Sequence, residues 1–285
     1  MNIKEKIKSF FPSVSFRKRR AFKSSGVTLI EIRELVQIQQ TNFLQNHHPN
    51  PLNSFGKKCF SQTDEDGITL EILRRIDSLE NGVFAEFGVG NGTENNTLIL
   101  KALGWRGFWV GGEDLAFEIK QPKEVFSYFK DWITLENITK LAGQGKSNCG
   151  SEKIDVISLD LDGNDIYFVE RLLSNGYTPK LFIVEYNPKF PPPIKWQITY
   201  DSKHVWDGDD YFGASLASFK ELFNKHSYRL ICCNSATGSN AFFIKNEFSN
   251  HFNDVPTDIN CLYVAPRHLL RKKWGALKTI ANLFA

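Results

Sequence analysis

Five acidic side chains stand at or just beyond the ends of short apolar runs, and they are the residues best suited to chemistry. They are Glu86, Glu113, Asp160, Asp162 and Glu185, and the amide of Asn187 follows the last of them. A strand end needs at most one acid to cap the helix after it, so acids after four runs indicate a binding or catalytic site. Carboxylates at such a site act as general bases or as oxygen ligands of a cation.

Three of these acids are candidate ligands of one cation. Asp160 and Asp162 stand two apart on a predicted strand, so their side chains point to the same side. With Glu185 from the next strand they could hold Mg²⁺, and with Asn187 they are the candidate catalytic residues. The alternative is that Asp162 and Asp165 shape the turn and cap the following helix. The string DLDGND is not a calcium loop, because its glycine is fourth rather than sixth.

A glycine-rich loop follows the apolar run 83–87. Gly88, Gly90 and Gly92 stand at alternate positions, where the missing Cβ lets the backbone turn sharply and lie flat against a ligand. A dinucleotide-binding fold prefers GxGxxG, whose third glycine packs the helix on the strand. Here Glu86 precedes GxGxG, so the loop is of nucleotide-binding size but not of the dinucleotide pattern.

Alternating strands and helices are expected to position these residues. Such alternation predicts an α/β fold: a doubly wound, mostly parallel seven-stranded sheet with a C-terminal antiparallel hairpin, and its ligand lies outside the carboxyl ends of the strands. The expected strands are residues 83–87, 107–112, 132–133, 154–161, 181–184, 228–233 and 241–245, and the expected helices are 61–79, 95–103, 166–173 and 214–223.

Length and composition favour one folded domain with appendages. The chain has 285 residues, of which 41% are hydrophobic, enough to bury a core. The predicted parts are a basic tail (1–26), a helical extension (27–60), the main domain (61–250) and a C-terminal extension (251–285). Five cysteines without CxxC spacing, the lack of an apolar run of about 18 residues and the lack of an apolar signal segment favour the cytoplasm.

The two ends of the chain are basic. Residues 1–26 carry eight Lys and Arg against one acid, and residues 267–285 carry five with none, so the residues between are net acidic. An acidic body argues against a nucleic-acid groove. The first segment is either a disordered tail or an attachment to the inner face of the membrane. The last contains a basic amphipathic helix that lies in a membrane interface, or docks on its own domain or on a second subunit of a homo-oligomer.

A long loop after the fifth strand is a candidate acceptor pocket. The loop is proline-rich at 189–195 and then mixes aromatic and acidic side chains, which suit a sugar-like acceptor. The candidate acceptor-binding residues are Tyr186, His204, Asp210 and Tyr211. His204 is also a candidate base, and ordinary packing is the alternative for each of these side chains.

The motifs together resemble a known family. SQTDEDG, FAEFGVGNGTENNT, GWRGFW, ITLENI, IDVISLDLDGND, VEYNP, DYFGASL and NAFF span about residues 60–246. This set resembles bacterial methyltransferase-like proteins related to the FkbM family, which are often associated with polysaccharide or secondary-metabolite gene clusters. The resemblance implies a class I S-adenosylmethionine-dependent methyltransferase with a Rossmann-like methyltransferase fold.

The resemblance also implies cofactor-binding residues. The methionine end of S-adenosylmethionine would be lined by Glu86, Gly88, Gly90, Gly92 and Asn95, with Asp160 close by. In the family an acid directly after the second strand holds the ribose hydroxyls, but this chain has Gly111 there, so Glu113 or Asp114 takes that role. Glu136 and Asn137 stand where the adenine amino group is commonly met, and capping of the next helix explains them equally well.

The sequence therefore predicts methyl transfer to a hydroxyl of a sugar, a surface polysaccharide or a secondary metabolite. The cofactor is S-adenosylmethionine and the second candidate cofactor is Mg²⁺. The alternative, from a different class, is a non-catalytic or weakly cofactor-binding methyltransferase-like module that acts as a partner in polysaccharide biosynthesis.

Overall fold

The computed structural model describes residues 29–267 and 277–283. Its backbone forms two compact units, residues 1–42 and 43–285. In the first unit the described residues are 29–42, and all of them belong to helix α3 (Leu29–His47). The second unit holds the sheet and every residue predicted for the site. The basic segment 1–26 and most basic residues of the C-terminal segment lie outside the described residues.

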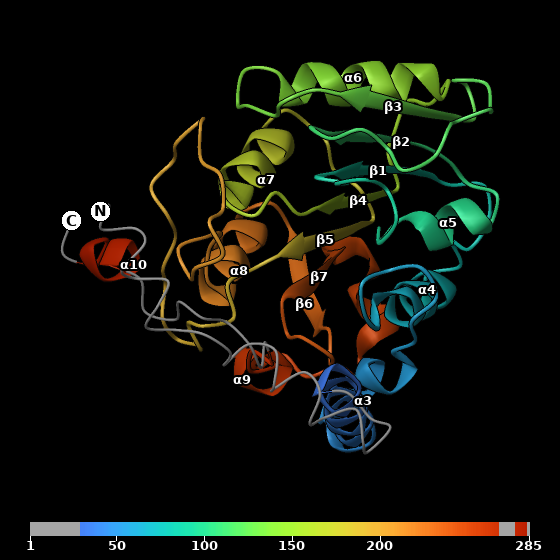
Figure 1. The fold of residues 1–285 in the computed structure, drawn as a ribbon. Helices are drawn as coiled ribbons and strands as arrows, with labels where there is room; N and C mark the ends of the chain where they lie inside the picture. Colours follow the sequence, from blue (N-terminus) through green and yellow to red (C-terminus); the bar gives the residue numbers. More distant parts are fainter. Residues whose placement is uncertain (1–28, 268–276, 284–285) are drawn as a thin grey trace, which may run out of the picture. The chain divides into compact units, whose positions relative to one another are not determined.

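The second unit is built on a seven-stranded sheet with the order β3-β2-β1-β4-β5-β7-β6 (Figure 1). Strand β7 runs antiparallel to both of its neighbours, and the pairs among the first five strands are all parallel. The predicted mostly parallel sheet with its C-terminal hairpin is confirmed. The strands are β1 (Val83–Phe87), β2 (Arg106–Gly111), β3 (Phe126–Lys130), β4 (Val156–Leu159), β5 (Leu181–Glu185), β6 (Tyr228–Cys233) and β7 (Asn240–Lys245).

Helices connect the strands and cover the sheet. Helix α6 packs beside α7 and also contacts β2 and β3, and α8 packs on β6. Right-handed crossovers place α5 on one face and α6, α7 and α8 on the other. The helices of this unit are α4 (Glu65–Arg75), α5 (Leu98–Ala102), α6 (Ile138–Asn148), α7 (Asp165–Ser174), α8 (Leu216–Lys225), α9 (Ile259–Leu262) and α10 (Leu277–Ala281), with 3₁₀ turns η2 (Pro51–Phe55) and η3 (Asn246–Phe252).

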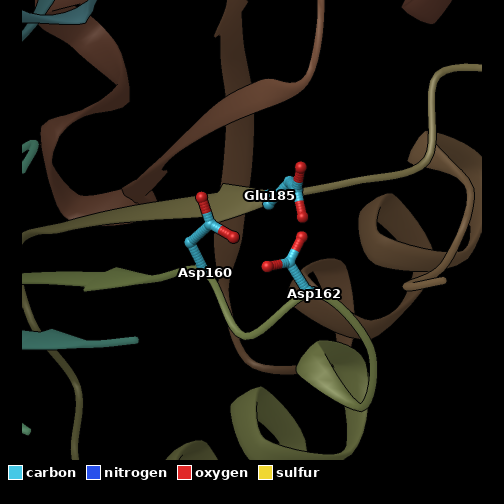
Figure 2. A group of neighbouring side chains, drawn as sticks. All are labelled: Asp160, Asp162 and Glu185. Atoms are coloured by element: carbon cyan, nitrogen blue, oxygen red, sulfur yellow. The ribbon is translucent and has the colours of Figure 1, made fainter. Parts of the chain in front are cut away.

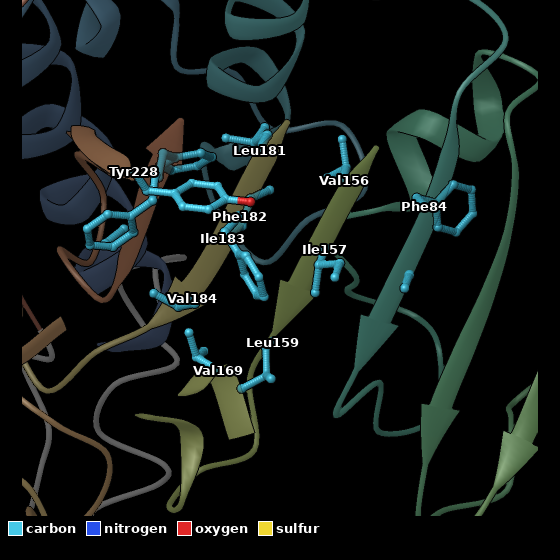
Figure 3. Close-up of a cluster of buried hydrophobic side chains, with 14 of the residues drawn as sticks. Phe84, Val156, Ile157, Leu159, Val169, Leu181, Phe182, Ile183, Val184 and Tyr228 are labelled. Carbon is cyan, nitrogen blue, oxygen red and sulfur yellow. The ribbon is translucent and has the colours of Figure 1, made fainter. Parts of the chain in front are cut away.

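The central strands form the core because they are apolar without interruption. Every residue of β1 and β4 is buried, as expected for parallel strands that helices cover on both faces. Figure 3 shows Phe84, Ile157 and Ile183 on three neighbouring strands of this cluster. Among the described residues, no helix combines the length and the apolar character that a membrane crossing needs.

The third strand was misplaced by the sequence prediction. It was expected at Trp132 and Ile133, but β3 ends at Lys130 and these two residues lie in the loop after it. Strand β3 is an edge strand with a half-exposed sequence, FSYFK, whose apolar pattern is weaker than that of the buried strands. Residues 131–133 therefore lie at the carboxyl end of the sheet.

The sheet register places the ends of several strands together. Glu86 is the partner of Ser158 in the pair of β1 and β4, and Glu185 is the partner of Asn240 in the pair of β5 and β7. Because β7 is antiparallel, its first residue, Asn240, lies at the same edge as the last residue of β5. This edge therefore carries side chains from β7 in addition to those of the parallel strands.

Candidate functional site

Glu86 anchors the glycine loop. Its buried carboxylate accepts hydrogen bonds from the backbone nitrogens of Asn96 (2.9 Å) and Thr97 (3.1 Å), and from the Thr97 hydroxyl. Burial raises the pKa of Glu86, and these hydrogen bonds act in the opposite direction. Asn95 donates to the Val89 carbonyl (3.3 Å), while its own buried Oδ1 has no hydrogen-bond partner among the described residues. The acid thus holds the loop and the start of α5 in one conformation.

Gly88 and Gly90 are glycines for different structural reasons. Gly88 has φ +93°, and a side chain there would overlap the carbonyl oxygen of Asp160 at the end of β4. Gly90 has φ +51°, and a Cβ there would meet no atom within 4 Å. The first glycine is needed for close packing of two strand ends, and the second faces open space beside them.

The structure brings the three predicted metal-binding acids together. Asp160, Asp162 and Glu185 each offer a carboxylate oxygen within 4.8 Å of the others, and Figure 2 shows the three carboxylates facing one another. Asp160 and Glu185 are half-buried, whereas Asp162 is exposed. The Oε2 atom of Glu185 is buried, and none of the described residues forms a hydrogen bond with it.

These acids lie in an environment that disfavours charge. Burial raises the pKa values of Asp160 and Glu185 well above the usual range, and the neighbouring carboxylates raise them further. Asp160 raises the pKa of Glu185, because two carboxylates this close repel when both are charged. Three oxygen donors in this geometry also match the ligand preference of Mg²⁺.

Asp165 shapes the turn after β4, as the sequence alternative proposed. Its two carboxylate oxygens accept from the backbone nitrogens of Leu161 (2.7 Å) and Gly163 (2.9 Å). Asp165 is fully buried, which raises its pKa to about 6. Asp162 lies in the same turn with φ +52° and an exposed side chain.

The end of β2 explains why glycine stands at position 111. A Cβ on Gly111 would lie 2.9 Å from a methyl carbon of Val89 and 3.3 Å from the Tyr128 hydroxyl. That hydroxyl donates to the carbonyl oxygens of Gly111 (3.1 Å) and Glu113. The side chain of Glu113 is exposed, and Asp114 forms an ion pair with Lys130 (2.7 Å). Because Asp114 is paired with Lys130, Glu113 is the better placed of the two candidate ribose ligands.

Asn137 has local partners that agree with the capping alternative. Its Oδ1 accepts from the Thr134 nitrogen (2.8 Å) and its Nδ2 donates to the Trp132 carbonyl (2.8 Å). Glu136 is exposed, and a hydrogen bond with Thr134 lowers its pKa. Their predicted contact with adenine stays a prediction.

A cavity of about 90 Å³ lies next to these elements, at the carboxyl ends of β2, β3 and β4. The sequence prediction missed Trp132 and Ile133 in its lining, because these two residues were assigned to a strand. The signal that could have located the cavity was an acid and a tryptophan, Asp131 and Trp132, directly after β3. The lining residues are Gly112, Asp131, Trp132, Ile133, Leu161, Asn164, Phe168, Ser202 and His204.

The side chain of Asn187 is bound by the loop between β5 and α8. It donates to the carbonyl oxygens of Asp210 (2.9 Å) and Phe212 (3.0 Å), and its Oδ1 accepts from the Lys189 nitrogen (3.1 Å). These contacts use both amide hydrogens and favour a positioning role. Tyr186 is also fully buried, and its hydroxyl donates to the Val264 carbonyl (3.4 Å).

Asp210 and Tyr211 connect the same loop to the C-terminal helix. The buried Asp210 forms an ion pair with Lys189 and accepts a hydrogen bond from the Thr279 hydroxyl (2.6 Å). The ammonium group of Lys278 lies 6.0 Å from the centre of the Tyr211 ring. The described part of the C-terminal segment thus contacts its own domain, as one of the alternatives proposed, and membrane contact stays a prediction.

A second polar cluster joins the start of α4 to the edge of the sheet. Glu65 is buried, and it accepts from the side-chain amides of Asn234 (2.9 Å) and Asn240 (3.0 Å). Asn240 lies opposite Glu185, and its buried Oδ1 has no hydrogen-bond partner. Sequence reasoning missed this connection because the two segments are about 170 residues apart.

No family model and no curated protein matches this chain. The predicted relation to the FkbM family is therefore not confirmed.

Several solved methyltransferase structures are similar at a low level. Magnesium protoporphyrin IX methyltransferase from Synechocystis PCC 6803, with bound S-adenosylmethionine, is 13% identical with a TM-score of 0.40, over 86% of this chain and 98% of that chain. MycE methyltransferase from the mycinamycin biosynthetic pathway is 11% identical with a TM-score of 0.33, over 62% of this chain and 45% of that one. The glycopeptide N-methyltransferase MtfA is 9% identical with a TM-score of 0.31, over 61% and 85%. The functional argument rests on the geometry of the site, not on these likenesses.

Proposed function

We propose that the chain is a methyltransferase that uses S-adenosylmethionine. The observation that carries this proposal is the open space over Gly90, which lies on a loop held by Glu86 and packed against Asp160. Because Gly90 has no side chain and borders open space, a ligand can approach its backbone closely. Unpartnered oxygens of Asn95 and Glu185 at the same sheet edge supply acceptors for the donors of a bound molecule.

The remaining residues fit the parts of this cofactor. The exposed carboxylate of Glu113 is the candidate partner of the ribose hydroxyls. The cavity beside Asp131 and Trp132 is a further candidate adenine site, beside the contact predicted for Glu136 and Asn137. When bound, the cofactor supplies a methyl group on a sulfonium, which an oxygen or nitrogen nucleophile can accept.

The acceptor we propose is a hydroxyl, as in a sugar, a surface polysaccharide or a secondary metabolite. An alcohol must lose a proton as it becomes a nucleophile, and a carboxylate with a raised pKa is a suitable general base near neutral pH. Glu185 meets this requirement, because its pKa is raised and its Oε2 has no hydrogen-bond partner in the part of the chain that the structure describes. Asp160 and Asp162 position that carboxylate, or bind Mg²⁺ together with it to stabilise an alkoxide.

Calorimetric titration of the full chain with S-adenosylmethionine and S-adenosylhomocysteine tests cofactor binding. Saturable heat with both ligands is expected. No heat at millimolar ligand would favour the alternative function, a non-catalytic module in polysaccharide biosynthesis.

The variant Glu185→Gln tests the general base. We expect it to keep cofactor affinity and to lower kcat on a hydroxyl acceptor by on the order of 10²-fold, a typical contribution of general base catalysis. Glu170→Gln is the matched control, because Glu170 is exposed on α7. Equal kcat values for Glu185→Gln and the control would refute the role of Glu185.

A further inference from the structure

One imidazole nitrogen in the loop between β5 and α8 is not explained by the fold. The Nε2 atom of His204 is buried and has no hydrogen-bond partner among residues 29–267 and 277–283. The ring lies directly on Gly163, where a Cβ would overlap Cδ2 and lie 3.0 Å from Nε2. Burying a polar atom without a partner is unfavourable, so a nitrogen in this position indicates a ligand that supplies the missing hydrogen bond.

The same ring lines the cavity at the ends of β2, β3 and β4. His204 and Ser202 line the cavity from the loop, and Gly112 and Asp131 line it from the positions directly after β2 and β3. Its volume is about 90 Å³, whereas a single water requires about 10–15 Å³ by the same measure. The cavity therefore has room for several atoms of a ligand.

The loop is fixed over this cavity by hydrogen bonds on both sides. Asn164 and Asp201 bind each other twice, from Asn164 Nδ2 to the Asp201 carbonyl (2.7 Å) and from the Asp201 nitrogen to Asn164 Oδ1 (3.2 Å). The indole nitrogen of Trp132 donates to the Ser202 carbonyl (2.9 Å). These contacts join the loop to the residues directly after β3 and β4, so that the segment carrying His204 is held in place before any ligand binds.

Two further hydrogen bonds hold the base of the loop in the same place. The Tyr167 hydroxyl on α7 donates to the Ile198 carbonyl (2.8 Å), and the Gly213 nitrogen donates to the Gly163 carbonyl (2.9 Å). Gly163 thus contacts the loop twice, through its carbonyl and through the His204 ring above it.

We propose that the loop segment 200–204 covers the nucleoside end of the cofactor site and that His204 Nε2 hydrogen-bonds the purine or ribose of the bound cofactor. The proposal rests on the proposed function. A purine nucleoside is a flat heteroaromatic group with donors and acceptors at its edge, and it matches a cavity lined by Trp132, Ile133 and Phe168 with a few polar groups. His204 is therefore a cofactor-binding residue rather than a base for the acceptor.

Calorimetric titration with three ligands tests this assignment: S-adenosylmethionine, S-adenosylhomocysteine and adenosine. His204→Ala removes the ring, and His204→Phe keeps an aromatic ring over Gly163 without the nitrogen. His251→Ala is the control, because His251 is exposed. Both His204 variants should bind each of the three ligands about tenfold more weakly than the wild type, equivalent to about 1.4 kcal/mol. The control should bind them with the affinity of the wild type.

The outcomes separate the two proposals. If the wild type binds S-adenosylmethionine and His204→Ala binds it equally well, the His204 contact is refuted and the proposed function stands. If His204→Ala loses affinity but His204→Phe does not, the ring acts by packing and the hydrogen bond is refuted. If the wild type binds none of the ligands, the proposed function fails and this inference fails with it.

Discussion

Alanine at Gly88 and at Gly90 should separate folding from ligand binding. Both glycines have positive φ values, +93° and +51°, so alanine at either position carries a conformational cost of about 1–2 kcal/mol. At Gly90 the added Cβ meets no atom within 4 Å, whereas at Gly88 it would lie 1.6 Å from the carbonyl oxygen of Asp160. Only Gly88→Ala must therefore push two strand ends apart.

The difference in stability between the two variants can be estimated from the hydrogen bonds beside Gly88. Moving the ends of β1 and β4 apart weakens the hydrogen bond from the Asp160 nitrogen to the Phe87 carbonyl (3.0 Å), and the shift of Gly88 itself weakens the bond from its nitrogen to the Val110 carbonyl on β2 (2.9 Å). Each contributes about 1 kcal/mol, and overpacking adds about 1–3 kcal/mol. We expect Gly88→Ala to lower the free energy of unfolding by roughly 4 kcal/mol and Gly90→Ala by about 1 kcal/mol.

Urea unfolding at 25 °C and cofactor titration measure the two effects. Gly90→Ala should retain most of its stability and yet lose affinity for S-adenosylmethionine by about tenfold or more, since its methyl group enters the proposed ligand space. Equal losses of stability in the two variants would contradict the packing argument. Unchanged cofactor affinity in Gly90→Ala would contradict the assignment of the loop.

Three further predictions concern the metal, the pH dependence and the C-terminal helix. Excess Mg²⁺ should raise the unfolding temperature of the wild type but not of Asp162→Asn, and the lack of any rise in the wild type would exclude the metal site. The pKa of Asp165 is raised from 3.8 to about 6, so its stabilising contribution is complete below about pH 4 and is lost as the pH rises through 6. The free energy of unfolding, measured with urea, should therefore fall by up to roughly 3 kcal/mol less between pH 4 and 7 in Asp165→Asn than in the wild type. The same pH profile in both proteins would contradict this. Thr279→Val removes the hydrogen bond to the buried Asp210 and should lower the free energy of unfolding by about 1–3 kcal/mol, whereas the exposed Lys278→Ala should change it by less than about 0.5 kcal/mol.

The acid cluster could be predicted because it depends on two simple rules. Residues two apart on a strand share a side, and parallel strands end at one edge, so the sequence brought Asp160, Asp162 and Glu185 together correctly. Continuous apolar runs likewise located the buried strands β1, β4 and β5. These features depend on local sequence and on the general geometry of a parallel sheet.

Other parts of the site depend on contacts that no local pattern encodes. Asn240 reaches the edge only because β7 inserts between β5 and β6, and its bond to Glu65 crosses 175 positions in the sequence. The edge strand β3 has a weak apolar pattern, so Trp132 was assigned to a strand and the cavity beside it was missed. Asn187 has the right type and place for chemistry, but its amide is bound by the backbone of a loop whose path could not be predicted.

The interior position of β7 has a consequence for synthesis of the chain. Strand β5 is complete at Glu185, but its second neighbour, β7, ends only at Lys245. Until those residues leave the ribosome, β5 presents an unpaired row of backbone donors and acceptors, the kind of edge that recruits strands from other chains. A chain interrupted before Lys245 therefore keeps this central strand open, and we expect such fragments to aggregate rather than to form a smaller version of the domain.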